Sequence, residues 1–416
     1  MRSIMRSVSI IIPVIREDKV ETCISAIVKN SGMRMDQYEI IHEFDSDGIG
    51  CPKMVAKLRK KCKNTLIMFL GDDTEPEENF LFEAVKAMSD LPDGWGVVGL
   101  NTQPGNPLAH WLADERILDL IPGGEFFSLE YAHCYGDNEL AEIAIEHGRW
   151  VYADKSKVKH NHPVNNTAED DDGYKKAYSE ANRIHDRKTF ITRKIDRMRK
   201  QGGKLGIGLP LTYDYVHKAF FETYTALVKP PHVQLMPKLP GQIDAVRNDI
   251  VEQALLLGCT HLLFIDTDQI YRSLDMIPMM YERMKDEDLK FLSAKVHRRY
   301  PPFDPILLKG KIGEFELISE ELTDSGDVIE LDATGAGCVM IDTRVFLEIE
   351  SPYFELRKSD TGKAVGEDIS FCAKLKEKGH SLFCDTSFVV GHLSMMEVDG
   401  SLNKLFRKIN KMEAPK

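Results

Sequence analysis

The sequence predicts an α/β protein with two similar domains in tandem, each built on a mostly parallel sheet with helices on both faces. Three observations predict this fold class. The 416 residues exceed the length that a single core usually serves. Short β-branched runs alternate with helical stretches. The same series of segments also occurs twice along the chain, which indicates an internal repeat.

Each series begins with an apolar run that ends in proline, at residues 8–13 in the first half and 205–210 in the second. Runs of this kind are typical of parallel strands that are buried on both faces. A helical stretch follows each run, at residues 19–30 and 215–227. Both halves therefore open with a predicted strand and helix.

A second apolar strand in each half ends in acidic residues. In the first half residues 66–70 precede Gly-Asp-Asp (71–73), and in the second half residues 261–265 precede Asp-Thr-Asp (266–268). From the proline to the last aspartate the distance is 60 positions in the first half and 58 in the second. Such close agreement supports a duplicated unit.

A third matching pair begins with an aspartate and ends at a glycine 11 positions later, at residues 137–148 and 368–379. Each is followed by a short apolar strand and a histidine, which is His160 or His162 in the first half and His392 in the second. The order of three matched segments predicts that both halves have one plan.

These repeats set the predicted domain boundaries. The first domain covers residues 1–165 and the second 204–400, with a charged helical connector at 166–203 and a basic tail at 401–416. The acidic motifs are 64 positions apart in the first half and 100 in the second, which predicts an insertion near residues 297–334.

Composition and charge exclude several classes of protein. Hydrophobic residues make up 43% of the chain and charged residues 29%, which is typical of a globular protein. The net charge of -12 argues against a general nucleic-acid-binding surface. No apolar run reaches the roughly 18 residues of a membrane span. The eight cysteines form no Cys-x-x-Cys pair, which favours a reduced, cytoplasmic setting over a zinc cage.

Asp266 and Asp268 stand at the carboxyl end of a predicted buried strand, where ligands bind in sheets of this class. Hard divalent cations prefer oxygen ligands and bridge a protein carboxylate to a substrate diphosphate. We therefore predict that both aspartates bind Mg²⁺ or Mn²⁺. Because aspartate also favours turns, an ordinary loop is the alternative.

Glu367 and Asp368 stand at the start of a predicted helix, residues 368–378. A carboxylate in this place either caps the helix or serves as a rigidly held general base. His392, which follows a short predicted strand, is a candidate to complete the metal shell, although a lone histidine is more often structural.

This order of motifs resembles that of the GT-A-fold glycosyltransferases, especially family 2-like enzymes, and covers nearly the whole chain as two copies. The resemblance implies two Rossmann-like domains in which Asp266 and Asp268 hold Mn²⁺ or Mg²⁺ and the diphosphate of a nucleotide sugar, with a UDP-sugar expected first. Asp368 would be the base of an inverting transfer, and Glu367 would assist it or contact the acceptor.

The same resemblance selects two further segments of the second half. Arg247 and Asn248 resemble a pair that is often placed near the nucleotide, and arginine suits phosphate, although an exposed helical arginine is commoner. Residues 334–337, Thr-Gly-Ala-Gly, resemble the glycine-containing stretch between donor and acceptor. Glycine equally suits a plain turn.

The first half departs from this pattern. Gly71 and Gly136 stand where the second half has the first carboxylate of each acidic pair. The first half keeps Asp73 and His162 as candidate metal ligands and Asp137 as a candidate base. We therefore expect the second domain to be the better catalyst and the first to be a separate transferase with a different donor preference or a binding module.

Three other aspartates of the first half are candidate nucleotide contacts. Asp72 neighbours the candidate metal ligand, and Asp45 and Asp47 follow the predicted strand 39–44, where such folds contact the base and ribose. A simple polar loop explains the last two equally well.

Other functions stay open from sequence alone. The first domain could be a non-catalytic module that binds a glycan, a nucleotide or a partner. The chain could also be a nucleotidyltransferase, since that chemistry likewise uses aspartate, a metal ion and a diphosphate. The acceptor would be a glycan or another hydroxyl compound. A basic run in the connector could contact modified DNA, although such runs are usually solvated helix faces. It comprises Arg183, Arg187, Lys188, Arg193, Lys194, Arg197, Arg199 and Lys200.

Overall fold

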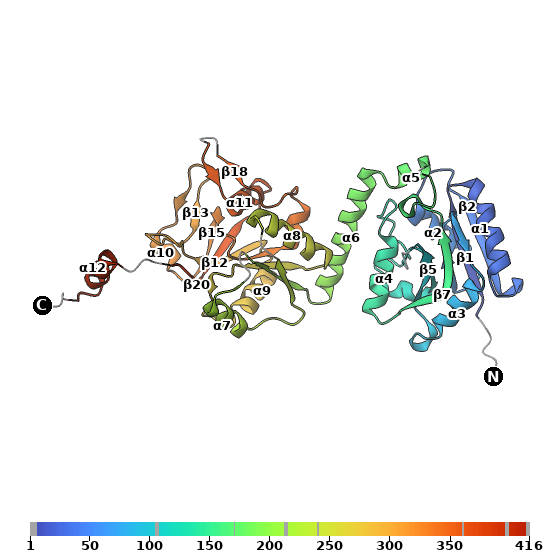
Figure 1. Ribbon diagram of the computed structural model, residues 1–416, viewed down its shortest axis with the longest axis horizontal. Helices are drawn as coiled ribbons and strands as arrows, with labels where there is room; N and C mark the ends of the chain where they lie inside the picture. The colour runs from blue at the N-terminus through green and yellow to red at the C-terminus, as the bar shows by residue number, and fades with distance from the viewer. Residues whose placement is uncertain are drawn as a thin grey trace. The chain divides into compact units, whose positions relative to one another are not determined.

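The computed structural model describes residues 6–104, 108–169, 171–211, 215–238, 241–359, 362–395 and 399–412 (Figure 1). The chain divides into two compact units, Met1–Phe190 and Ile191–Lys416, which we call unit 1 and unit 2. Both contain a large sheet flanked by helices, so the α/β class is confirmed. The boundary falls within helix α6 (Glu180–Lys200).

Unit 1 contains a seven-stranded sheet in the order β2-β1-β3-β6-β5-β7-β4. Strands β1, β2, β3, β5 and β7 run in one direction, and β6 and β4 run against them. The strands are β1 (Val8–Val14), β2 (Tyr38–Phe44), β3 (Leu66–Phe69), β4 (Thr74–Pro76), β5 (Val97–Gln103), β6 (Trp111–Asp114) and β7 (Trp150–His160).

Two hydrophobic clusters lie on the two faces of this sheet. Alternate residues of β1 divide between them, because successive side chains of a strand point to opposite faces: Ile10 and Ile12 belong to one cluster and Ile11 to the other. Helices α1 and α3 pack on the first face, and α2 and α4 pack on the second (Figure 1). These helices are α1 (Glu17–Asn30), α2 (Cys51–Arg59), α3 (Phe80–Met88) and α4 (Gly136–Glu146).

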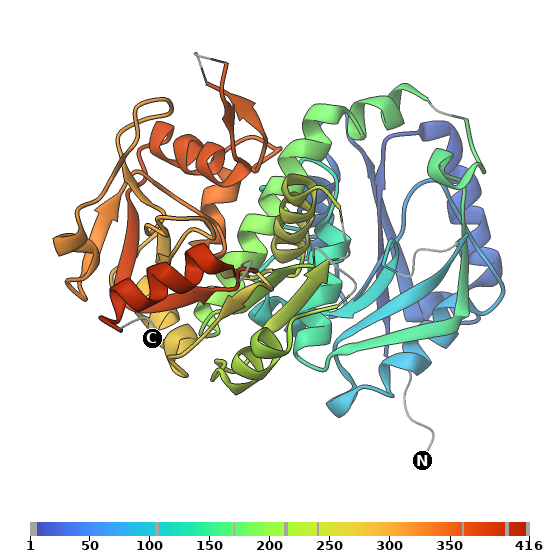
Figure 2. The same ribbon diagram turned by 60° about the vertical axis from the view of Figure 1, so that its left-hand side comes forward.

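The main sheet of unit 2 follows the order β9-β8-β10-β17-β12-β20-β11, and β15 (Val328–Leu331) pairs alongside β20. Figure 2 gives a second view of both sheets. The strands are β8 (Leu205–Pro210), β9 (Gln234–Lys238), β10 (His261–Ile265), β11 (Gln269–Ile270), β12 (Phe291–Val296), β17 (Cys338–Asp342) and β20 (Leu382–His392). The helices are α7 (Lys218–Ala226), α8 (Ile243–Leu256), α9 (Met276–Asp286) and α11 (Glu367–Glu377).

The seven main strands of unit 2 repeat the order and the directions of those in unit 1. The match extends to an irregularity. The register of β5 on β7 shifts between Leu100 and Asn101, and that of β12 on β20 shifts between Ala294 and Lys295. A duplicated unit accounts for a bulge that recurs at one topological position, since bulges are specific features of a fold.

Additional elements separate β12 from β17 in unit 2. They include a three-stranded sheet in the order β14-β13-β16, the short helix α10 (Glu320–Thr323) and β15. The small strands are β13 (Leu307–Lys309), β14 (Glu316–Leu317) and β16 (Ala333–Thr334). This is the place in the chain where the sequence predicts an insertion.

A buried aspartate is paired with two arginines at the same position of each unit. Asp114 ends β6 and binds Arg6 at 2.5 Å and Arg116 at 2.8 Å. Asp342 ends β17 and binds Arg199 and Arg344, both at 2.6 Å. Each carboxylate is 1% exposed, so it needs charged partners to offset its desolvation.

The predicted connector contains α5 (Asp172–Ala177) and α6. Asp186 of α6 accepts three backbone N–H groups of unit 1, from Ala132, His133 and Cys134, at 2.6 to 2.8 Å. The first part of α6 is thereby fixed to unit 1. Helix α12 (Gly400–Ile409) lies in the predicted basic tail. None of the helices in the described ranges has the length and apolarity needed to cross a membrane.

Candidate active sites

The pairing of the last two strands identifies equivalent residues in the two sheets. In unit 1 the residue after Asp73 pairs with His160, and in unit 2 the residue after Asp268 pairs with His392. His160 is therefore the counterpart of His392. His162, the histidine that the sequence favours as a ligand, lies two residues further on. Its ring packs against that of Tyr174 in α5, with the ring centroids 4.6 Å apart.

In unit 2, Asp268 and His392 lie side by side. Asp268 Oδ2 is 3.2 Å from His392 Nε2 and 2.9 Å from Arg299 Nη1. The Nδ1 atom of His392 lies 2.8 Å from the carbonyl oxygen of His297. A carbonyl in this place favours the proton on Nδ1, which directs Nε2 toward the carboxylate.

This pair fits a divalent cation. Burial raises the pKa of Asp268, but the hydrogen bond and charge of His392 outweigh it and hold the pKa below its ordinary value. Burial lowers the pKa of His392, but the hydrogen bond to Asp268 outweighs it and raises the pKa. A metal ion can replace the proton between such atoms. Neighbouring ligand atoms on one ion are about 3 Å apart when each bond is about 2.1 Å.

Asp266 and Glu367 are joined by one buried arginine. Arg247 is 3% exposed, and its Nη2 donates to the two carboxylate oxygens of Asp266 at 3.1 and 3.3 Å. Its Nε lies 3.4 Å from Glu367, and its Nη1 donates to the carbonyl of Ala336 at 3.0 Å. The predicted nucleotide contact Arg247 thus holds two predicted site carboxylates together. Burial raises the pKa of Asp266 above its ordinary value despite this arginine.

Asp368 is the second residue of α11, and its Oδ1 accepts the N–H of Ile369 at 2.8 Å. Burial and then the charge of Glu367 raise the pKa of Asp368 to about 6. A carboxylate with this pKa is ionised at neutral pH and is a stronger base than an exposed aspartate. The position and chemistry of Asp368 suit proton abstraction from a hydroxyl.

The predicted glycine-containing segment runs between these carboxylates. A Cβ on Gly337 would lie 3.0 Å from Asp266 Oδ2 and only 2.2 Å from Gln269 Nε2. A Cβ on Gly335 would lie 3.5 Å from Asp368 Oδ2. A larger residue at position 337 would therefore have to displace the end of the Gln269 side chain.

Asn248 has a different role from the one that the sequence predicts. Its Nδ2 donates to the carbonyls of Asp244 and Phe354, and its Oδ1 accepts the N–H groups of Tyr353 and Phe354, at 2.8 to 3.0 Å. An amide side chain has two donor hydrogens and two acceptor lone pairs. All four are used within the protein, so Asn248 anchors residues 353–354 rather than a nucleotide.

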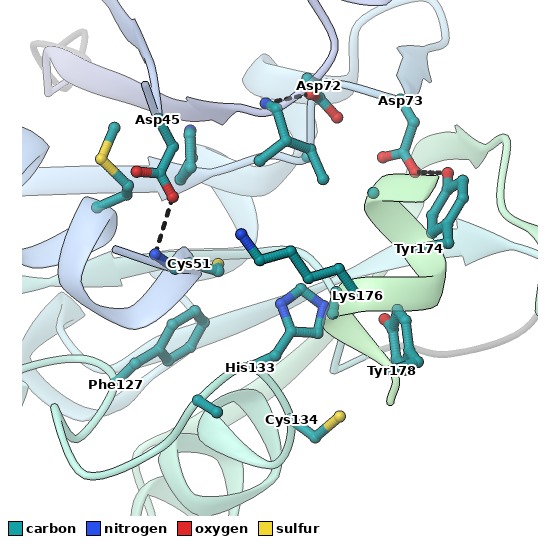
Figure 3. Close-up of a pocket in the computed structure, with 18 of the residues that line it drawn as sticks. Asp45, Cys51, Asp72, Asp73, Phe127, His133, Cys134, Tyr174, Lys176 and Tyr178 are labelled. Atoms are coloured by element: carbon teal, nitrogen blue, oxygen red, sulfur yellow. Dashed lines mark hydrogen bonds between the residues drawn. The ribbon is translucent and has the colours of Figure 1, made fainter. Parts of the chain in front are cut away.

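In unit 1 a cavity of about 760 Å³ opens at the carboxyl ends of the strands (Figure 3). Its size lies within the roughly 300–1,000 Å³ of small-molecule sites. Five predicted site residues line it together: Asp45, Asp72, Asp73, Asp137 and His162. Asp47 is exposed on the neighbouring loop and is not part of the lining.

Asp72 is 1% exposed and binds Arg16 in a fork. Its Oδ1 accepts from Arg16 Nε at 3.0 Å and from Nη2, and its Oδ2 accepts the N–H groups of Ile15 and Arg16 at 2.8 Å. Burial raises the pKa of Asp72 despite the arginine. These donors place the carboxylate against the turn after β1.

Three donors converge on one oxygen of Asp73. Oδ2 accepts the hydroxyl of Tyr174 at 2.5 Å and lies 3.2 Å from Arg16 Nη2 and 3.4 Å from His160 Nε2. Burial would raise the pKa of Asp73, but these partners hold it well below its ordinary value. The side chain is only 4% exposed.

Asp137 reproduces the geometry of Asp368. It is the second residue of α4, its Oδ1 accepts the next backbone N–H at 2.9 Å, and burial raises its pKa to about 6. The packing also explains why Gly136 stands before Asp137, where the second half has a glutamate. A Cβ on Gly136 would lie 2.7 Å from the ring of Phe127, so no glutamate fits there without displacing that ring.

Asp45 shapes the far side of the cavity. Its two carboxylate oxygens accept the N–H groups of Ile49 and Gly50, both at 2.8 Å. This closes the loop after β2 into a tight turn. Asp45, a predicted nucleotide contact, therefore lies at the cavity, but its carboxylate oxygens are hydrogen-bonded to the backbone of its own loop.

The cavity is also lined by Arg16, Tyr174, Lys176 and Tyr178, which no sequence pattern predicts as site residues. Three of them belong to α5 or the residue after it, in the predicted connector (Figure 3). A short helix linking two domains carries no signal of its own. Only its fold back over the strand ends brings these side chains to the site.

The donor sets of the two units differ in their fit to a metal. Across the described ranges, no three His, Cys, Asp or Glu side chains are grouped as a metal shell. In unit 2 the Asp268–His392 pair fits as two ligands, and Asp268 is 35% exposed to further ligands. In unit 1 the equivalent oxygen of Asp73 is enclosed by Arg16 and Tyr174, and this donor set does not fit.

No protein-family model matches the chain, and no curated protein matches it. Solved structures with similar folds include A197 from STIV, at 14% identity and a TM-score of 0.33, covering 47% of this chain and 86% of that one. S. aureus TarS 1–349 with UDP has 10% identity and a TM-score of 0.34, covering 46% and 66%. GalNAc-T7 with UDP, GalNAc and Mn²⁺ has 11% identity and a TM-score of 0.35, covering 50% and 48%. Likenesses at these TM-scores do not assign a function.

Proposed function

We propose that the protein is a glycosyltransferase that moves a sugar from a nucleotide-sugar donor to an acceptor hydroxyl. One observation carries this proposal: both units hold the same constellation at equivalent positions. It consists of a strand-end aspartate beside a cross-strand histidine and of an aspartate with a pKa of about 6 at the start of a helix. The members are Asp73, His160 and Asp137 in unit 1 and Asp268, His392 and Asp368 in unit 2.

The chemistry of these groups matches sugar transfer. The helix-start aspartate takes the proton of the acceptor hydroxyl while the hydroxyl oxygen bonds to the anomeric carbon of the sugar. The bond from that carbon to the diphosphate breaks, and the nucleoside diphosphate leaves with the electron pair. The strand-end groups lie at the edge of the sheet where ligands bind and would face the diphosphate.

In unit 2, Asp268 and His392 would hold a divalent cation, Mn²⁺ or Mg²⁺, whose charge stabilises the leaving diphosphate. Arg247 keeps Asp266 and Glu367 in place beside it, and Asp368 takes the proton. Because both units carry the constellation, we propose two transfer sites in one chain, with UDP-sugars as the first donors to test.

The decisive experiment identifies what leaves the donor. The full chain is incubated with UDP-, GDP- and CDP-sugars and Mn²⁺ or Mg²⁺, and the nucleotide products are separated by chromatography. We expect a nucleoside diphosphate to be released from one donor class. The matched control is the chain with Asp137→Asn and Asp368→Asn, which should bind the donor and release about a hundredfold less product.

Two results would contradict the proposal. Release of pyrophosphate with transfer of the nucleotide would assign nucleotidyl transfer instead. Binding of a nucleotide sugar with no turnover in the wild-type chain, with glycan acceptors present, would leave both units as binding modules.

A further inference from the structure

The strand-end carboxylates of unit 1 are already bound by a cation of the protein itself. The guanidinium of Arg16 lies between them, with a fork to Asp72 and a 3.2 Å contact to Asp73. It also stacks on the ring of Tyr174 at 4.4 Å, and the Tyr174 hydroxyl donates to the same oxygen of Asp73, Oδ2. A divalent ion would have to displace both partners from a carboxylate that is 4% exposed.

Unit 2 has the opposite arrangement. The side chain of Asp268 is 35% exposed, and the arginine beside it, Arg299, is 50% exposed. An exposed ion pair contributes little free energy and is displaced easily. The two units thus place equivalent aspartates in unlike surroundings, one open to an added cation and the other closed around a resident one.

Two cationic side chains of the unit 1 cavity, Arg16 and Lys176, have donor groups that can bind an anionic ligand. Arg16 lines the cavity, and its buried Nη1 atom has no hydrogen-bond partner among the described residues. Lys176 of α5 crosses the cavity, with its ammonium directed toward Asp45 and Cys51 (Figure 3). In the part of the chain that the structure describes, this ammonium has no ion-pair partner, and it lies 3.1 Å from the place of a Cβ on Gly48.

The carboxylates at the strand-end side of the cavity are hydrogen-bonded within the protein, and Asp137, the candidate base that also lines the cavity, uses one oxygen for the N–H of Asn138. Both oxygens of Asp45 and of Asp72 accept hydrogen bonds from backbone or guanidinium donors, and Oδ2 of Asp73 accepts from three groups. An anionic ligand therefore meets donors at this end of the cavity. Arginine and lysine are the side chains suited to phosphate oxygens. Like a metal ion, they can stabilise the charge of a transferring phosphoryl group.

We infer that unit 1 binds the diphosphate of its donor through Arg16 and Lys176 without a divalent cation. This inference rests on the proposed function of unit 1 as a nucleotide-sugar site. It makes α5, a segment of the predicted connector, part of the donor site. It also assigns different cofactor requirements to the two units, with only unit 2 dependent on Mn²⁺ or Mg²⁺.

The test is a calorimetric titration of the full chain carrying Asp268→Ala, which removes a predicted metal ligand of unit 2. UDP, ADP, GDP and CDP are the probes, each in excess EDTA and again in Mn²⁺. We expect one nucleotide to bind in EDTA, with a Kd that changes less than threefold when Mn²⁺ is present. Lys176→Ala should weaken this binding tenfold or more.

Lys175→Ala is the matched control, because Lys175 lies on the same short helix, pairs with Asp172 at 3.7 Å and does not line the cavity. Its Kd should equal that of the parent chain, and thermal melting checks that both variants are folded. Binding that requires Mn²⁺ and is lost in Asp73→Ala would overturn the inference and leave the proposed function intact. An unchanged Kd in Lys176→Ala would overturn it as well. If none of the nucleotides binds with or without Mn²⁺, the proposed function fails together with the inference.

Discussion

At the scale of single residues, the two helix-start aspartates are the groups whose chemistry depends most on their surroundings. Asp137 and Asp368 both have a pKa of about 6 because burial disfavours the ionised form. Each also accepts the next backbone N–H, as a helix cap would. Capping and catalysis predict different responses to substitution by asparagine, which keeps the shape and removes the charge.

The first prediction concerns transfer. Asp368→Asn should lower transfer by unit 2 about a hundredfold or more while the donor Kd stays unchanged, since a lost general base has an effect of this size. In the wild-type chain the rate should rise with pH up to about 6 and level off above it, because only the ionised carboxylate accepts a proton. A pH–rate profile of single turnovers measures both. A rate that falls only in proportion to the folded fraction would favour capping.

The second prediction concerns stability and has a defined sign. The folded-state pKa of Asp368, about 6, lies above the ordinary value of 3.8, so folding favours the protonated form. The resulting contribution to stability is complete below about pH 4 and is lost as the pH rises through 6. Asp368→Asn escapes this loss. Its Tm relative to wild type should therefore increase between pH 4.5 and pH 7.5, by a few degrees. A constant difference across that range would contradict the raised pKa.

Gly136 supports a third prediction. Gly136→Glu would copy the Glu-Asp pair of the second half, yet the new side chain meets the Phe127 ring within 2.7 Å. Overpacking of this kind costs roughly 1–3 kcal/mol. We expect the Tm of unit 1 to fall and its nucleotide binding to weaken. Improved transfer by unit 1 would show that the glycine is a lost carboxylate rather than a requirement of the packing.

The sequence could identify the acidic residues but not their partners. Asp266, Asp268 and Asp368 lie at strand and helix ends, which local patterns predict. Arg16 and Tyr174 are 56 and 101 positions from the aspartates they bind, and no local pattern brings them together. The resemblance places Asn248 near the nucleotide, and its contacts to residues 353–354 are not visible in the sequence because they involve a segment more than a hundred positions away.

At the scale of elements, the predicted strands and helices that open each half agree with the structure to within a few residues. The proline-ended runs became β1 and β8, and the strands before the acidic motifs became β3 and β10. Buried parallel strands have continuous apolar runs, which makes them visible in sequence. The later strand β20 is longer than predicted, Leu382–His392, because its first half pairs with β12 and with β15. Such pairing joins segments that are distant in the chain and is not encoded locally.

Helix α5 is an element of the unit 1 site that no sequence pattern predicts. Its six residues include the exposed basic pair Lys175 and Lys176, and by sequence they belong to a charged connector. In the structure it carries Tyr174 and Lys176 to the strand ends of unit 1. Elements that line a site from outside the sheet are positioned by tertiary contacts alone.

At the scale of the whole molecule, the fourth prediction separates the contributions of the two units. One variant combines Asp73→Ala with Asp137→Ala, and the other combines Asp268→Ala with Asp368→Ala. With a common acceptor, we expect each variant to lack one added sugar by mass spectrometry, because each unit keeps its own constellation. Loss of all transfer in the second variant alone would make unit 1 a binding module. Loss in the first variant alone would place all catalysis in unit 1.

The buried ion pairs of Asp114 and Asp342 bear on where the chain can be divided. Each aspartate takes one arginine from the residues that precede the first strand of its own unit, Arg6 before β1 and Arg199 before β8. A fragment that starts at the predicted domain boundary, residue 204, would lack Arg199 and leave the buried carboxylate of Asp342 with Arg344 and the more distant Lys290 as its charged partners. We expect such a fragment to melt at least several degrees below one that starts at residue 191. The useful cut for separate expression therefore lies inside a helix, at a place that no linker composition would suggest.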